Sequence, residues 1–213
     1  MRKIRAVLLV LLALSGCRSR TQVWSIEEPI STFDPRVVVN QSTLRIHRMI
    51  FNGLSKLDAN GEVAPDLAES FSAAPDLASY IFKLRAGVRF HNEHVLTSLD
   101  VKYTFETMLS DAFTPERRFK PTRSLAAIEV PDALTVVFKC NGPCPDLPAE
   151  VATIGIIPEG TSRLQASRPI GTGPYRLQSD KNEREFILVA HQDYFGGRPE
   201  VGRIDVKVAP AAP

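Results

Sequence analysis

The sequence predicts a mixed α/β protein, because segments with the period of a strand occur along the chain together with segments that have the period of a helix. Tyr80, Phe82 and Leu84 point one way and the residues between them point the other, which is the pattern of a strand with one buried face. The period becomes that of a helix over residues 98–110, and alternation returns at 204–208. A chain of 213 residues, 44% hydrophobic and 23% charged, is long enough for one or two small domains with a core.

The helix expected at residues 98–110 carries its own start signal. Thr97 can cap it, and Asp100 follows three residues later as a shortened partner in a capping box. The apolar residues of this segment lie four and three apart and share one face: Val101, Phe105 and Met108. Before it, Gly87 interrupts the strand, so we expect a strand, a turn and a capped helix in succession.

A second helix is predicted over residues 42–54, with Ser42 or Thr43 as its cap and Gly53 at its end. The Asp-Ala-Asn-Gly sequence at 58–61 that follows is typical of a hairpin turn. The remaining alternating or apolar segments predict strands at 23–26, 125–129, 134–139, 175–177 and 185–190. Segments rich in proline or polar residues predict loops at 114–122 and 140–148.

The N-terminus has the composition of an export signal. Basic residues at positions 2, 3 and 5 precede an apolar run over 6–14, which is too short to span a membrane. The sequence Leu14-Ser15-Gly16-Cys17 is similar to a bacterial lipobox, in which Cys17 would be cleaved at its amino side and lipidated. We therefore expect a signal peptide over 1–16 and a lipidated tether over 17–22. An ordinary signal peptide or a short buried helix is the alternative.

Removal of residues 1–16 changes the charge balance. They hold three of the 26 basic residues and no acidic ones, so 26 less 3 leaves 23 basic against 24 acidic residues. The apparent basicity of the chain therefore lies in the leader, and we expect no nucleic-acid partner.

Two cysteines remain after Cys17. Cys140 and Cys144 are separated by Asn-Gly-Pro, and an exported protein occupies a compartment where disulfides persist. A disulfide that closes so small a loop is geometrically demanding, so a disulfide and two free thiols both remain open. A zinc site is disfavoured because no second pair of ligands lies nearby.

Several motifs together resemble one protein family, the solute-binding proteins of bacterial ABC importers for peptides and nickel (family 5). The motifs are Phe82-x-Leu84-Arg85-x-Gly87-Val88-x-Phe90-His91, Met49-Ile50-Phe51-Asn52-Gly53-Leu54, Pro65-Asp66-Leu67-Ala68-Glu69, Pro169-Ile170-Gly171-Thr172-Gly173-Pro174-Tyr175 and Tyr194-Phe195-Gly196-Gly197. One departure follows His91, where the family has Asp-Gly and this chain has Asn92-Glu93. Glycine supplies positive φ in such a turn, and Asn92 tolerates that conformation better than most residues, so we expect the turn to survive in an altered form.

The resemblance implies a lobe like that of the type II periplasmic binding proteins, with an inserted smaller α+β domain. Residues 23–54 and 156–208 would share the sheet of the first lobe, 55–155 would form the inserted domain and 209–213 a tail. The resemblance covers only the N-terminal portion of the family, so the second lobe is missing. We expect either a fragment of a longer gene product or a shortened homologue.

The function implied is that of an extracytoplasmic binding lipoprotein, anchored in the bacterial cell envelope through Cys17, on the periplasmic or outer face of a membrane. It would bind a peptide or similar small solute and deliver it to an ABC permease. The resemblance places the ligand beside two segments, Val39, Asn40 and Gln41, and Gly171, Thr172 and Gly173. The alternative at the second segment is that the glycines only shape the fold.

Other functions are also considered. A single lobe cannot clamp a ligand, so a non-transporting surface lipoprotein or decayed remnant with a scaffolding role is the alternative function. The sequence contains neither Gly-x-Ser-x-Gly nor a phosphate-binding loop, so we expect no enzyme and no cofactor. The polar cluster at 91–94 is interpreted as a solvated turn rather than a metal site.

Overall fold

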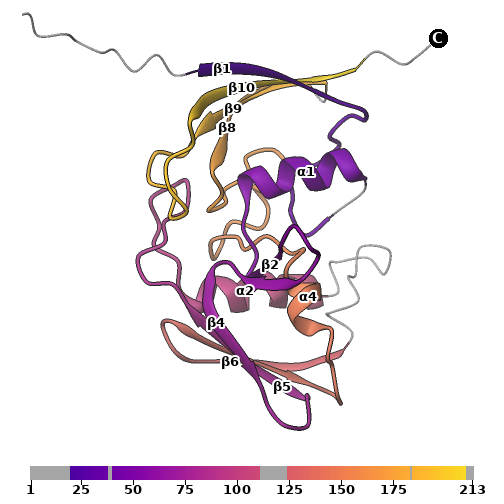
Figure 1. The fold of residues 1–213 in the computed structure, drawn as a ribbon, viewed down its shortest axis with the longest axis vertical. Helices are drawn as coiled ribbons and strands as arrows, with labels where there is room; N and C mark the ends of the chain where they lie inside the picture. Colours follow the sequence, from indigo (N-terminus) through magenta and orange to yellow (C-terminus); the bar gives the residue numbers. More distant parts are fainter. Residues whose placement is uncertain (1–19, 38–39, 111–123, 183, 210–213) are drawn as a thin grey trace, which may run out of the picture.

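The computed structural model describes residues 20–37, 40–110, 124–182 and 184–209. Two four-stranded sheets lie at opposite ends of the described part of the molecule, and α1 (Gln41–Ile50) lies between them (Figure 1). No helix within these ranges combines the length and the apolar character needed to cross a membrane.

The first sheet joins the beginning of the chain to its end. Its strand order is β1 (Arg20–Ile26), β10 (Val201–Val208), β9 (Glu185–Ala190) and β8 (Tyr175–Asn182). β1 runs parallel to β10, whereas the other neighbours are antiparallel. β1 begins at Arg20 rather than at the predicted residue 23, so the prediction of a tether is wrong for residues 20–22, which pair with β10.

α1 covers the inner face of this sheet. Ile46 and Ile50 are fully buried and belong to one apolar cluster with side chains of two strands, β9 and β10: Phe186, Leu188, Ile204 and Val206. The helix is capped by Asn40, whose Oδ1 accepts from the Thr43 N–H at 2.7 Å, and not by Ser42 or Thr43 as predicted. It ends at Ile50, four residues before the predicted end, because the next residue is extended.

The second sheet has the order β4 (Ala68–Ala73), β5 (Ser79–Leu84), β7 (Thr135–Cys140) and β6 (Leu125–Asp132), and all its neighbours are antiparallel. The alternation predicted for β5 is present, since Tyr80, Phe82 and Leu84 are buried and Ile81 is 41% exposed. Strand β6 runs three residues past its predicted end, so Pro131 and Asp132 belong to the strand rather than to the turn.

Helix α2 (Ser98–Leu109) packs on this sheet, and Phe105 contacts the ring of Phe138 with a centroid distance of 5.0 Å. Its predicted start is confirmed: the carboxylate of Asp100 accepts from the Thr97 N–H at 2.8 Å. The predicted loop over 114–122 lies outside the described residues.

Two short elements connect the sheets. The hairpin of β2 (Ser55–Leu57) and β3 (Val63–Pro65) has the predicted turn, in which Gly61 has a φ of +82°. α4 (Leu147–Val151) begins inside the segment predicted as a loop over 140–148. Pro148 lies in the first helical turn, where the missing N–H of proline costs nothing, so the proline content did not exclude a helix.

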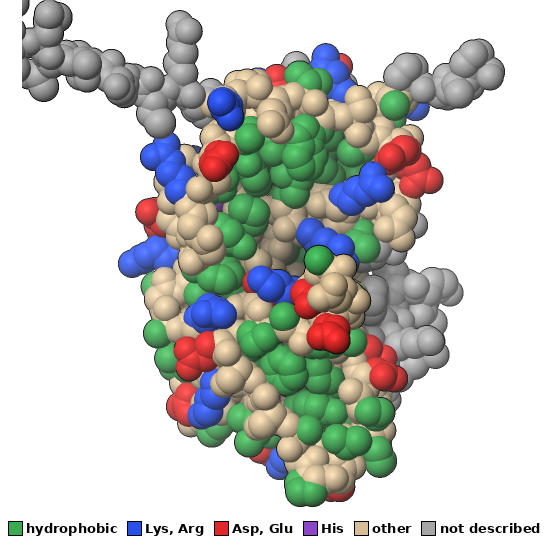
Figure 2. Space-filling view, in the orientation of Figure 1, with side chains coloured by type: hydrophobic (Ala, Val, Ile, Leu, Met, Phe, Trp, Pro, Cys, Tyr) green, Lys and Arg blue, Asp and Glu red, His purple; other side chains and the backbone are tan. Residues whose placement is uncertain are grey.

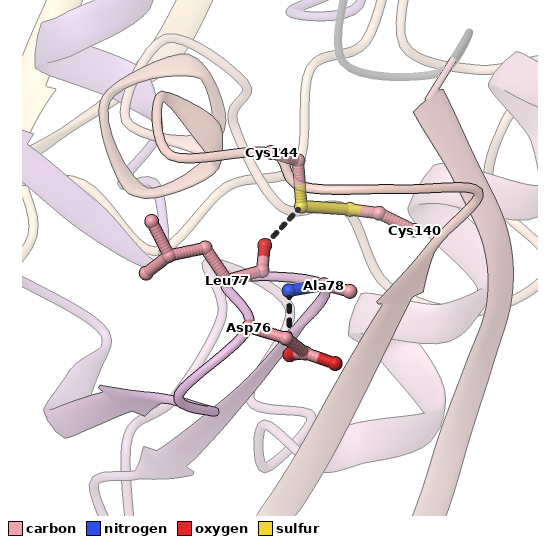
Figure 3. The surroundings of a disulfide bond; sticks show 5 residues. All are labelled: Asp76, Leu77, Ala78, Cys140 and Cys144. Atoms are coloured by element: carbon pink, nitrogen blue, oxygen red, sulfur yellow. Dashed lines mark hydrogen bonds between the residues drawn. A yellow bond between two sulfur atoms is a disulfide. The ribbon is translucent and has the colours of Figure 1, made fainter.

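Cys140 and Cys144 form a disulfide, with 6.5 Å between their Cα atoms (Figure 3). The Cys144 N–H donates to the Leu77 carbonyl at 2.9 Å, and the Cys144 sulfur lies 3.4 Å from the same oxygen. A bonded sulfur has no proton, so the second approach is a contact. The structure therefore has the disulfide and not two free thiols. The bond joins the end of β7 to the segment before α4, and it packs on the β4–β5 turn.

The turn after His91 is present in an altered form. Glu93 has a φ of +68°, whereas Asn92 does not have a positive φ. Asn92 instead accepts a hydrogen bond from the His94 N–H at 3.3 Å. The left-handed position is therefore the second residue of the pair, where the family has glycine.

Candidate ligand-binding pocket

The Gly171–Gly173 turn packs directly against the end of α1. A Cβ at Gly171 would overlap the carbonyl oxygen of Ile50, and one at Gly173 would lie 2.5 Å from the Met49 oxygen. The Gly173 N–H donates to the Ile50 carbonyl at 2.9 Å. Only glycine permits so close an approach of two backbones, so both glycines have a structural role at this turn.

Thr172 connects this turn to a buried polar network. Its hydroxyl donates to Asn52 Oδ1 at 3.1 Å, and Asn52 Nδ2 donates to Asp66 Oδ2 at 2.9 Å. Asn52 Nδ2 also lies 3.3 Å from the hydroxyl of Tyr194. Burial raises the pKa of the Asp66 carboxyl and of the Tyr194 phenol, and the hydrogen bond from Asn52 to Asp66 opposes the first effect.

An open pocket of about 270 Å³ lies over this network, at the junction of α1, the β2 strand and the segment after α4. Asn52, Asp66 and Tyr194 line it, whereas Thr172 lies behind Asn52. The other lining residues come from α1, from the β2 region and from residues 152–155: Leu44, His47, Arg48, Phe51, Gly53, Lys56, Leu57, Ala152, Thr153 and Gly155. Figure 2 shows Lys and Arg side chains across the middle of the molecule, between apolar surfaces toward the two ends.

His47 is a neutral member of the pocket wall. Burial lowers its pKa to about 4, so it carries no charge at pH 7. Its Nε2 lies 3.3 Å from the Thr32 carbonyl oxygen, which requires the proton on Nε2. Its Nδ1 is buried and has no hydrogen-bond partner in the described part of the chain.

The residues predicted to face a ligand lie in three different settings. Asn40 caps α1, and Gln41 is exposed at the first position of that helix. Gly171, Thr172 and Gly173 support the pocket from behind and do not line it. Val39, and Cys17 with its predicted lipid, lie outside the described residues.

Sequence reasoning missed Asn52, Asp66 and Tyr194 as pocket residues. Each lies within one of the motifs that carry the family resemblance, but in a different one. The only signal for the pocket in the sequence was therefore that each of these residues lies in a family motif. It could not show which side chains meet, because the three residues are far apart in the chain.

The polar cluster at 91–94 forms the predicted turn, in which residues 92–94 are exposed and only His91 is half-buried. His91 is half-buried: its Nδ1 accepts from the Gly171 N–H at 3.3 Å, and its Nε2 donates to the Gly173 carbonyl at 3.1 Å. His191 Nδ1 lies 3.2 Å from the same oxygen. His94 pairs with Asp100 at 3.0 Å.

Burial lowers the pKa of His91 to about 4, so the imidazole is neutral at pH 7 and fastens the segment between β5 and α2 to the glycine turn. Over the described ranges, no three His, Cys, Asp or Glu side chains gather in a way that could hold a metal ion.

The fold and the pocket define a class: an α/β protein with an open pocket beside α1. Residues 62–213 match the model described as bacterial extracellular solute-binding proteins, family 5 Middle. The chain therefore belongs to this family of solute-binding proteins, which are not enzymes.

Similar proteins include the oligopeptide-binding protein AppA of Bacillus subtilis, which is 28% identical over 202 residues, covering 89% of this chain and 37% of AppA. The di/tripeptide-binding protein 1 of Pseudomonas aeruginosa is 28% identical over 185 residues, covering 73% of this chain and 34% of that protein. This chain thus spans about a third of the length of these relatives.

The solved structures agree with this assignment. The structure of AppA in complex with a nonapeptide has a TM-score of 0.82 at 25% identity, and it covers 89% of this chain and 40% of AppA. The structure of AgaA from A. tumefaciens R10 in complex with agropinic acid has a TM-score of 0.81 at 27% identity, with the same two coverages.

Proposed function

We propose that this chain is the N-terminal portion of an extracytoplasmic solute-binding lipoprotein of an ABC importer, and that its solute is a peptide or a similar small molecule. The observation that carries the proposal is the match to AppA, solved with a nonapeptide, over 89% of this chain. The pocket beside α1 supports it, because the polar groups of Asn52, Asp66 and Tyr194 converge in a concave site with apolar walls.

Solute binding is tested by thermal melting of the purified protein with and without a pool of mixed short peptides. A ligand that binds only the folded state raises the melting midpoint, so a rise of several degrees is expected. A cooperative melt that does not shift would contradict peptide binding and would favour the non-transporting lipoprotein with a scaffolding role.

The proposed anchor is a lipid on Cys17, added after removal of residues 1–16. The apolar run over 6–14 and the Leu-Ser-Gly-Cys sequence support it. Cells that express the protein should incorporate labelled palmitate into it and retain it in the membrane fraction. Cys17→Ser should lose both properties, and a Cys17→Ser protein that still takes up label would contradict the assignment.

A further inference from the structure

A second cavity, of about 500 Å³, lies along strand β8. Five consecutive residues of that strand line it, Arg176–Asp180, together with His91, Asn92 and the segment 167–170. β8 is an edge strand, because β9 is its one neighbour among the described strands. Successive side chains of a strand point to opposite faces of the sheet, so five residues in a row line one cavity where the backbone edge itself faces it. The cavity is therefore a groove along the free edge of β8, and we call it the β8 groove.

The segment 167–170, which forms the other wall of the groove, keeps its own backbone donors. The N–H groups of Ser167 and Arg168 donate to the Leu164 carbonyl at 3.1 and 2.7 Å, and the Ile170 N–H donates to the side chain of a buried glutamine at 2.9 Å. Pro169 has no N–H. β8 bonds β9 on one side only, and an edge strand presents a row of unpaired N–H and C=O groups on the other. A chain that enters the groove therefore finds its backbone partners on β8.

The groove has the dimensions of one extended peptide segment. Five strand residues span about 17 Å at roughly 3.3 Å each, and ligand sites have volumes of roughly 300–1,000 Å³, a range that includes this one. Both walls are fixed, because Leu177 packs against the apolar cluster of the first sheet and Ile170 against that of the second. The space between two fixed walls suits one added strand rather than the edge of a whole sheet.

Arg168 and Arg176 give the groove an excess of positive charge. Both side chains are exposed, and neither has an ion-pair or hydrogen-bond partner among the described residues. The charge of Arg176 does act on His91, but it repels a proton there and lowers the pKa of that imidazole, which is neutral at pH 7. Asp180 is the one acidic residue among those that line the groove. It lies about 13 Å from Arg176 along an extended strand, which exceeds the Debye length of about 10 Å at 0.1 M salt.

We propose that the β8 groove binds an extended, acidic segment of a partner protein, which joins the first sheet as a strand beside β8. Backbone hydrogen bonds to a free sheet edge supply affinity in this mode of recognition. Arg168 and Arg176 would select carboxylate side chains through charge-assisted hydrogen bonds. No residue lines both this groove and the pocket beside α1, so the inference goes beyond the proposed function and does not depend on it.

The test uses an octapeptide of alternating threonine and glutamate with fluorescein at its N-terminus, followed by fluorescence anisotropy at pH 7 and low salt. This peptide should bind, and the same peptide with lysine in place of glutamate should not. Arg168→Gln and Arg176→Gln should each weaken binding by roughly two- to fivefold, the effect of losing one exposed ion pair. Arg163→Gln is the matched control, because it removes an exposed positive charge that does not line the groove, and it should leave binding unchanged.

Methylation of the peptide's backbone nitrogens separates strand addition from attraction by charge. Methylation of every nitrogen removes all the backbone donors and keeps the glutamates, so it should abolish binding. Methylation of alternate nitrogens blocks one edge of the extended peptide, because successive N–H groups point to opposite edges. At least one of the two peptides made in this way should still bind, since β8 offers a single edge.

Each contrary result overturns the proposal. The first is no binding of the threonine–glutamate octapeptide, or equal binding of its lysine counterpart. The second is binding that neither Arg168→Gln nor Arg176→Gln weakens, which would place the peptide elsewhere, such as the pocket beside α1. The third is an effect of Arg163→Gln as large as that of Arg176→Gln, which would indicate unspecific attraction. Unchanged binding of the fully methylated peptide would exclude strand addition, and so would loss of binding by both half-methylated peptides. The proposed solute-binding function has its own test and stands in all these cases.

Discussion

Gly171→Ala should destabilise the protein strongly, because the new methyl group has no room. Its Cβ would overlap the Ile50 carbonyl oxygen and would lie 2.6 Å from a ring carbon of Phe51. The first of these atoms belongs to the backbone and cannot move alone. Overpacking of a core costs about 1–3 kcal/mol, and we expect the upper end of that range. The lower entropy of the unfolded alanine chain offsets under 1 kcal/mol of it.

The measurement is urea and thermal denaturation followed by circular dichroism. A loss of about 3 kcal/mol in a chain of this length lowers the melting midpoint by roughly 6–12 °C. Gly142→Ala is the matched control, since its Cβ would meet nothing within 4 Å and its φ is not positive; it should change stability by less than about 0.5 kcal/mol. If Gly171→Ala melts like the parent but loses peptide binding, the glycine serves the ligand and the structural reasoning is refuted.

Three further predictions concern other parts of the molecule. Glu93→Gly should raise the free energy of unfolding by about 1 kcal/mol, because Glu93 has a φ of +68°. Asn92→Gly should not raise it. Equal effects of the two variants in urea titrations would contradict the left-handed conformation of Glu93. Burial lowers the pKa of His91 from 6.5 to about 4, so the unfolded chain takes up a proton in that range that the folded chain does not. The contribution of His91 is therefore full above pH 6.5 and is lost as the pH falls to 4, by about 3 kcal/mol. Unfolding free energies between pH 7 and 4 should fall less steeply for His91→Gln, and an unchanged slope would exclude His91 as the cause. Reduction of the Cys140–Cys144 disulfide should lower stability by about 2 kcal/mol, the loop-closure value for so short a loop; a protein with serine at both positions that resists urea as well as the parent would show that the bond contributes little.

Local patterns were enough to predict the elements that depend on local physics. The alternation at Tyr80–Leu84 and the Thr97–Asp100 cap were both found, because a strand face and a capping box are complete within a few residues. The cap of α1 was placed too late. Asn40 is as good a cap as the two candidates after it, and only the backbone geometry selects among three adjacent polar residues.

The pocket and the contacts of His91 could not be predicted in the same way. Asn52 meets a residue 14 positions away and another 120 positions away, and no sequence period connects them. His91 looked solvated because its neighbours are polar. It is half-buried because it contacts the Gly171–Gly173 turn, about 80 residues later. Such sites are set by tertiary contact, and a family resemblance locates the segments without pairing their side chains.

The early start of β1 has a mechanical consequence for an anchored protein. Strand β1 begins at Arg20, and three peptide units separate it from Cys17. Fully stretched, they reach about 10 Å, roughly one Debye length at 0.1 M salt. A lipid at the proposed position would thus hold β1, the edge strand of the first sheet, close to the lipid headgroups. The anchored protein would then reach a permease by lateral diffusion in the plane of the membrane. Trp24 is the only tryptophan of the chain and is 39% exposed on β1. It would be an intrinsic fluorophore at the place where β1 meets the membrane surface.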